Sequence, residues 1–244
     1  MDWESPARPA ELTESRLIAA ILDGAFPINS LLPAERELAE KLGVTRPTLR
    51  EALQRLGRDG WLEIHQGKPT RIRNYWQEGN LGLLNAITRD VDKLPPDFIT
   101  QLLEARISLA PDYTALAVAR HPVEVVALLK SYQNLDETAE AYSQADWELH
   151  HRLTIASANP VYTLILNGFR NLYLLFGPLY FASETNRAHS LNFYRELEAA
   201  SLQKDPQAAH AITLRVMTES LTNYQALNPT TPEVTYETLA RMGR

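Results

Sequence analysis

The sequence of 244 residues contains no cysteine. This absence excludes disulfides, thiolate catalysis and cysteine-based zinc or iron–sulfur sites, so the fold must rest on packing. Long apolar runs are missing too, because residues 164–166 and 172–176 are interrupted well before the roughly 20 residues that a membrane-spanning helix needs. Residues 1–15 carry acidic side chains and lack the apolar core of a secretory signal. We therefore expect a cytoplasmic protein with no membrane partner.

Catalytic motifs are absent as well. The sequence has no nucleophile elbow, no Walker loop and no glycine-rich dinucleotide turn, and nothing in it places a serine beside a histidine. We therefore expect no catalytic residues, no cofactor and no enzyme activity. What the chain does contain is apolar side chains, since its 45% hydrophobic content suffices for packed cores in two domains.

The acidic balance is confined to one part of the chain. The formal net charge is −6, but residues 1–76 hold 11 basic and 11 acidic residues, whereas the remainder holds 13 and 19. Within residues 33–73 there are 9 basic and 6 acidic residues. This local basic excess lies where the phosphates of a nucleic acid would be met, so the overall acidity does not exclude DNA binding.

Short helical patterns with a tight turn between them occupy residues 34–59. A first helix is predicted over residues 11–24, and a second runs from about Ala34 to Leu42. Gly43 and Val44 form the turn, after which the hydroxyl of Thr45 can cap the third helix. The arrangement predicts a helix-turn-helix.

A small hairpin follows these helices. Residues 61–65 and 70–73 alternate like strands around Gln66, Gly67 and Lys68, a turn that glycine favours. A hairpin behind a helix-turn-helix is the wing of a winged helix-turn-helix.

Beyond residue 80 only helical patterns remain. The segment 74–80 has no sustained period and marks a boundary. The predicted fold class is mainly α: a winged helix-turn-helix domain over 1–76, a linker over 77–80, an all-α effector-binding domain of six to seven helices over 81–230, and a C-terminal tail over 231–244. The expected helices are about 81–92, 95–119, 122–135, 137–157, 159–182, 187–203 and 206–226.

The third predicted helix carries the side chains of a DNA reader. An α-helix fits the major groove, where its N-terminal residues reach base edges and arginine matches guanine best. A glycine-containing, basic wing tip can enter a minor groove. One alternative is that these arginines form a solvated charged face on a small helical domain, which the ordered set of elements disfavours. The other is a winged-helix domain used for protein contacts. The candidate DNA-binding residues are Arg36, Thr45, Arg46, Thr48, Arg50, Gln66, Gly67 and Lys68.

The segment PAERELAEKLGVTRPTLREALQRLGRDGWLEIHQGKPTRI resembles the DNA-binding head of the GntR superfamily of bacterial transcription factors. Within that superfamily, the segments 156–173, 178–183 and 192–197 are similar to the FadR branch, which governs fatty-acid metabolism. The resemblance implies a homodimer bound to a palindromic double-stranded operator. One departure concerns the wing, where the FadR-like order Gln-His-Gly is replaced by His65-Gln66-Gly67.

The same resemblance implies an effector site in the helical domain. Long-chain fatty acyl-CoA would bind there and release the DNA, with Arg106 as a plausible cation for the CoA phosphates. Tyr224 stands where the relatives have a tryptophan. The ligand-site positions that match are Arg106, Tyr180, Glu219, Ser220 and Tyr224.

Asp146 and His150 raise the question of a metal, because their i, i+4 spacing puts both on one helix face. GntR relatives outside the FadR branch add two further histidines, but here Tyr194 and Thr218 take those positions. Two ligands of four make a poor site, so we predict no metal and a hydrogen-bonded pair instead. A regulator of this superfamily that responds to a small organic or sugar acid, with a divalent metal, is the alternative.

An aromatic-rich strip runs along residues 162–181. Such a strip is either core or the wall of a lipid channel, and the sequence leaves both readings open.

Overall fold

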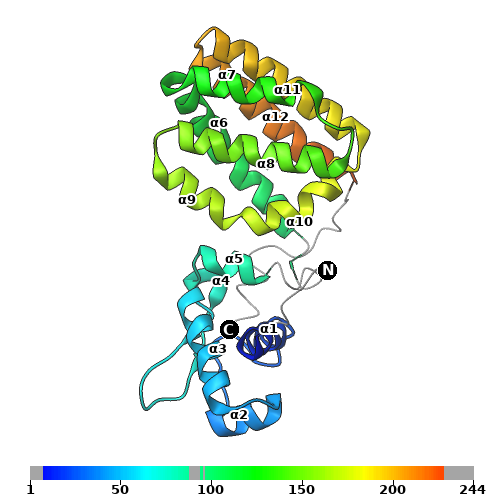
Figure 1. Cartoon of the computed structure of the whole chain (residues 1–244). Helices are drawn as coiled ribbons and strands as arrows, with labels where there is room; N and C mark the ends of the chain where they lie inside the picture. Colours follow the sequence, from blue (N-terminus) through cyan, green and yellow to red (C-terminus); the bar gives the residue numbers. More distant parts are fainter. Residues whose placement is uncertain (1–7, 88–93, 96, 228–244) are drawn as a thin grey trace. The chain divides into compact units, whose positions relative to one another are not determined.

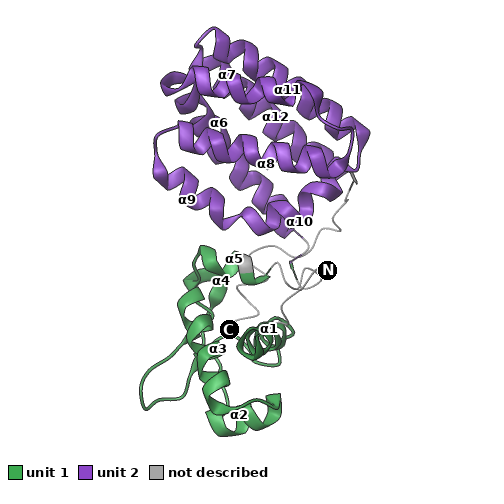
Figure 2. Ribbon diagram, viewed as in Figure 1, with its two compact units in different colours: residues 1–94, 234–244 green, residues 95–233 purple. Residues whose placement is uncertain are grey.

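The computed structural model describes residues 8–87, 94–95 and 97–227, and the chain forms two compact units (Figure 2). The first unit reaches Leu94 and the second begins at Pro95. Figure 1 labels the elements of both. The mainly helical fold predicted from the sequence is confirmed. In the part of the chain that is described, no helix is both long enough and apolar enough to span a bilayer.

The first unit is a winged helix-turn-helix. Its apolar core contains Leu17, Leu49, Leu56, Trp61 and Ile72, none of which retains measurable exposure to solvent. Because these side chains come from helices and hairpin alike, packing fixes the position of the third helix. The unit consists of α1 (Pro9–Leu22), α2 (Glu35–Leu42), α3 (Arg46–Asp59), β1 (Leu62–Glu63), β2 (Arg71–Ile72), α4 (Tyr75–Glu78) and α5 (Leu81–Ile87).

The turn between α2 and α3 has the expected chemistry. Gly43 ends α2 with φ 68°, a left-handed conformation that glycine adopts without steric cost. Thr45 is the N-cap of α3, and its hydroxyl oxygen accepts a hydrogen bond from the Thr48 amide at 3.4 Å.

The hairpin strands are shorter than the sequence suggests. They pair only Leu62 with Ile72 and Glu63 with Arg71 in antiparallel register, and Arg71 also forms a bridge to Leu31. Of the other residues of the expected strands, Ile64, His65 and Thr70 lie in the connection of the wing, whereas Trp61 precedes β1 and Arg73 follows β2. So short a ladder leaves the orientation of the wing to side-chain contacts.

The boundary between the units lies later than the expected one at 77–80. Residues 75–78 form a helical turn, and the Tyr75 ring packs against Trp61 with centroids 4.7 Å apart. The α5 residues Leu83, Ala86 and Ile87 are buried in the first core. The amphipathic pattern at 81–87 does form a helix, but its apolar face packs in the core of the first unit and not in the second unit.

The second unit contains only helices among its described residues. Its central helix, α8, packs against α6, α7, α9, α10 and α11, and α12 packs along α6 (Figure 1). The helices are α6 (Phe98–Arg120), α7 (Pro122–Ser131), the short 3-10 helix η2 (Tyr132–Asn134), α8 (Ala139–Ala156), α9 (Pro160–Gly168), α10 (Arg170–Phe181), α11 (Glu184–Leu202) and α12 (Pro206–Leu227).

One expected helix, 159–182, is in fact two. The chain leaves the helical path at Phe169, just after Gly168, so α9 and α10 each pack on α8. Glycine lowers the cost of such an interruption. The predicted tail, 231–244, and the end of the predicted 81–92 helix lie outside the described residues.

Candidate nucleic-acid interface and effector pocket

The exposed end of α3 presents two arginines. The side chains of Arg46 and Arg50 are 56% and 57% exposed, because they project from the first turns of α3 while Leu49 and Leu53 face the core. The Thr45 and Thr48 hydroxyls lie 2.8 Å apart beside them. The structure thus gathers these four predicted residues at one helix end, where a groove could be read.

Glu35, which sequence reasoning missed, joins both arginines. Its Oε2 accepts a hydrogen bond from Nε of Arg50 at 2.7 Å and lies 3.9 Å from Arg46. Exposed ion pairs of this kind stabilise little, so the effect of Glu35 is to orient the guanidinium groups. Arg36 remains 80% exposed, with its nearest acid, Glu40, at 4.0 Å.

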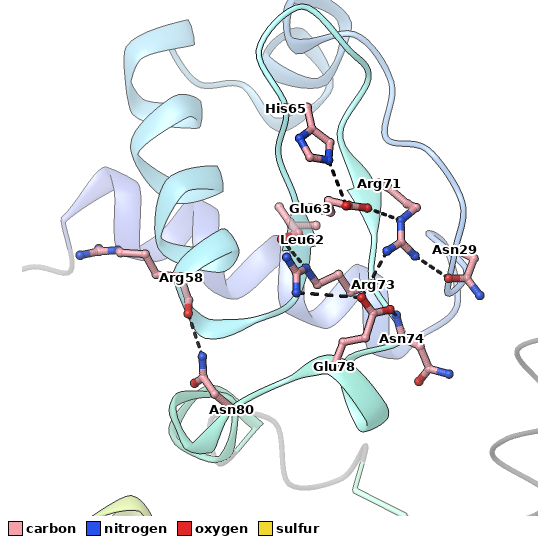
Figure 3. Close-up of polar contacts among 10 residues, drawn as sticks. All are labelled: Asn29, Arg58, Leu62, Glu63, His65, Arg71, Arg73, Asn74, Glu78 and Asn80. Atoms are coloured by element: carbon pink, nitrogen blue, oxygen red, sulfur yellow. Dashed lines mark hydrogen bonds and ion pairs between the residues drawn. The ribbon is translucent and has the colours of Figure 1, made fainter.

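The tip of the wing is free of packing. Gln66, Gly67 and Lys68 are exposed, and Gly67 has φ 75°. His65, which lies one position before the tip, contacts β1: its Nε2 is 3.0 Å from the carboxylate of Glu63 (Figure 3). The tip therefore offers an amide and an ammonium group to a partner.

A pocket of about 410 Å³ opens within the second unit. Its walls are mostly apolar, which suits an aliphatic ligand. The aromatic strip contributes part of the wall, whereas Tyr162 of the same strip packs against the core. The apolar lining residues include Ile99, Leu103, Leu172, Phe176, Phe193 and Met217.

Four of the five predicted ligand residues line this pocket. Arg106, Tyr180, Ser220 and Tyr224 do so. Glu219 does not, because its carboxylate lies 2.7 Å from Nε2 of His189 and 3.2 Å from Arg215. Adjacent positions on α12 point in different directions, so only Ser220 of that pair reaches the cavity.

A buried polar cluster closes one side of the pocket. The carboxylate of Asp146 accepts hydrogen bonds from the hydroxyls of Tyr173 at 2.7 Å and Tyr194 at 3.3 Å. Burial raises the pKa of both tyrosines, so they remain donors. Arg106 lies 3.5 Å from the same carboxylate and 4.8 Å above the Tyr173 ring. Its positive charge is therefore balanced inside the protein.

His150 belongs to this cluster and is fully buried. Burial lowers the pKa of His150, Asp146 opposes this effect and the charge of Arg106 adds to it, so that the pKa falls to about 4. The neutral ring accepts from Arg106 at Nε2, 3.0 Å away, and Nδ1 lies 2.7 Å from the hydroxyl of Tyr113. Sequence reasoning paired His150 with Asp146 alone; Tyr113 and Tyr173 carry no motif that could have identified them.

The described residues contain no group of three or more potential metal ligands. Asp146 and His150 do lie together, with 3.8 Å between Nε2 and Oδ1, but the guanidinium group of Arg106 contacts both. A resident cation thus takes the place that a metal ion would need.

Two family models match the chain. Residues 9–72 match "Bacterial regulatory proteins, gntR family", and residues 73–235 match "FadR C-terminal domain". The first model covers the three helices and the hairpin, and the second covers the pocket.

Curated relatives extend the similarity over most of the chain. A "Fatty acid metabolism regulator protein" from Shewanella denitrificans is 47% identical over 81% of this chain and 82% of its own length. The protein of the same description from Shewanella baltica strain OS155 is 46% identical over 81% and 83%. The relatives are regulators and not enzymes.

A solved structure shares the fold. It is that of Lar, described as controlling expression of the Listeria monocytogenes agr system, with 18% identity and a TM-score of 0.56 over 91% of this chain and 99% of that one.

Proposed function

This chain belongs to the gntR family of bacterial regulatory proteins, in the group with a FadR C-terminal domain, and on that premise we propose that it regulates fatty-acid metabolism by binding DNA as a homodimer and releasing it when long-chain acyl-CoA binds. The proposal places the protein in the cytoplasm.

The observation that carries the DNA-binding role is the exposed pair Arg46 and Arg50 at the capped start of α3. Recognition helices reach base edges with their N-terminal residues, and arginine can donate two parallel hydrogen bonds to guanine O6 and N7. Glu35 holds the Nε edge of Arg50 and leaves its two terminal nitrogens for a base. Arg36, Thr45 and Thr48 supply further contacts, and the wing tip enters the minor groove.

The apolar pocket supports the acyl-CoA effector. A cavity of about 410 Å³ with aliphatic and aromatic walls favours a hydrocarbon chain over a sugar. Among the described residues, Arg106 is the only cation in the lining, and it is already balanced by Asp146. We therefore place the acyl chain in the pocket and the CoA phosphates outside it. Arg106, Tyr180, Ser220 and Tyr224 then surround the chain or its thioester end.

Release follows from linkage. An effector that binds the DNA-free arrangement more tightly must lower DNA affinity by the same factor, and two heads on fixed half-sites make the dimer sensitive to their spacing. The alternative effector is a small organic or sugar acid bound with a divalent metal. The balanced charge of Arg106 and its contact with His150 disfavour that alternative.

The experiment is a selection of genomic fragments by the purified protein, followed by anisotropy titrations on the enriched sequence. We expect a palindromic site whose affinity far exceeds that of a scrambled duplex, and loss of binding when oleoyl-CoA is added. Equal affinity for both duplexes would refute specific regulation. Release by a small carboxylate and not by oleoyl-CoA would move the effector to the alternative class.

A further inference from the structure

We propose that Glu78 is the residue that positions the wing for DNA. The inference rests on the proposed function and adds a residue that touches neither a base nor a phosphate. The ladder of two residue pairs between β1 and β2 is too short to fix the direction of the seven-residue connection that forms the wing.

Arg71 ties the base of the wing to three separate segments (Figure 3). Its Nε donates to Glu63 of β1 at 2.6 Å, one terminal nitrogen donates to Asn29 at 2.7 Å, and the other donates to Glu78 of α4 at 3.3 Å. Asn29 adopts φ 67°, a left-handed conformation that asparagine adopts more often than most other non-glycine residues.

Glu78 contacts the second strand and the two residues that follow it. Its Oε2 faces Arg71 at 3.3 Å and Arg73 at 3.9 Å, while Oε1 accepts from the Asn74 amide at 3.1 Å. Arg73 in turn donates from Nε to the Leu62 carbonyl of β1 at 3.2 Å. One carboxylate therefore connects α4 to β2 directly and to β1 through Arg71 and Arg73.

These contacts explain why two arginines of the basic head do not serve as phosphate ligands. Arg71 and Arg73 are about two-thirds buried and lie against carboxylates, whereas Lys68 at the tip is exposed. The network fixes the direction of the wing, and Lys68 makes the contact with DNA. A wing held in place in advance loses less conformational freedom on binding.

Glu78→Gln distinguishes the roles of the two carboxylate oxygens. The amide oxygen of glutamine can still accept from the Asn74 amide, but the NH₂ group cannot pair with the arginines. The substitution also removes a negative charge from a DNA-binding head, which by itself raises affinity for a polyanion. The proposal predicts the opposite sign: a loss of operator affinity of roughly fivefold, the size expected of partly exposed charged contacts.

The matched control is Glu37→Gln. Among the described residues, Glu37 forms its ion pair with Lys41, at 2.8 Å within α2, and not with an arginine of the hairpin. The change in net charge is identical, so we expect unchanged or slightly higher operator affinity. Thermal unfolding of both variants checks that the heads stay folded. Glu78→Asp is a second variant, which keeps the charge, and it should recover part of the lost affinity.

A double-mutant cycle with Lys68→Ala provides the decisive readout. If Glu78 acts through the wing, Lys68→Ala weakens operator binding in the wild type but has little further effect in Glu78→Gln. A residue that only stabilises the fold would give additive losses. Glu37→Gln and Lys68→Ala should be additive.

The outcomes separate the inference from its premise. A wild type without sequence preference refutes the proposed function, and a Lys68→Ala variant with full affinity refutes the role of the wing tip on which the inference depends. If Lys68→Ala weakens binding while Glu78→Gln raises affinity or adds independently, the positioning role of Glu78 is wrong.

Discussion

Arg106 donates a hydrogen bond to Nε2 of His150 across 3.0 Å, and thereby occupies the ring nitrogen that a metal ion would take. The same guanidinium group lies 3.5 Å from the carboxylate of Asp146. The spacing that suggests a metal site therefore encloses a cation of the protein's own. This arrangement leads directly to two predictions.

The first prediction concerns metal content. Purified protein should contain zinc, nickel and manganese far below one equivalent, because Arg106 and three tyrosines satisfy Asp146 and His150. Elemental analysis by mass spectrometry tests this after dialysis without chelator. Near-stoichiometric metal that disappears in His150→Ala would show that the guanidinium group yields to a metal ion.

The second prediction concerns pH. His150 titrates near 4 in the folded chain and near its ordinary 6.5 when unfolded, so only the unfolded state gains a proton as pH falls through this window. Its contribution to the free energy of unfolding should decline by about 2 kcal/mol between pH 7 and pH 5. Urea titrations of the wild type and His150→Gln measure it: the gap between the two should narrow at pH 5. A gap independent of pH would contradict the depressed pKa.

The elements predicted best from sequence are those with local causes. Gly43 favours the turn after α2 through its own backbone, and Thr45 caps α3 through its own side chain. Both the turn and the cap occur as expected. The interruption at Phe169 and the membership of α5 in the first core depend on what the segments pack against. The pattern of apolar residues in one segment does not show which other segment that apolar face packs against.

The third prediction concerns the reading arginines. Arg46→Ala should lower operator affinity at least about tenfold, the loss expected when a bidentate contact to a base is removed. Arg58→Ala removes the same charge from the last turn of the same helix and should have a small effect. Anisotropy titrations on operator and scrambled duplexes separate the two. Equal losses in both variants would mean that α3 acts through charge alone.

The fourth prediction concerns the pocket. Leu103→Trp places a larger ring in the wall of the cavity, and displacing two methylene groups of a ligand costs about 1.6 kcal/mol, more than tenfold in affinity. The variant should bind DNA normally and resist release by oleoyl-CoA. Leu174→Trp is the control, since Leu174 is exposed and outside the lining. A normal response in Leu103→Trp would place the acyl chain elsewhere.

The candidate site shows the same division between local and long-range causes. Exposure of the arginines follows from the helical period of α3, whereas the link from Glu35 to Arg50 depends on how two helices cross. Tyr113 and Tyr173 converge on the Asp146–His150 pair from α6 and α10. No spacing in the sequence encodes that convergence, because the residues are far apart along the chain.

The most direct test of the central claim is one titration on one DNA duplex. Wild-type protein is bound to its selected operator at constant salt, and oleoyl-CoA is added while anisotropy is recorded, with free coenzyme A as the control. We predict release by oleoyl-CoA, none by coenzyme A, and tighter oleoyl-CoA binding to the DNA-free protein by the same factor. Stable DNA binding at saturating oleoyl-CoA, with calorimetry proving that the ligand is bound, would contradict the account.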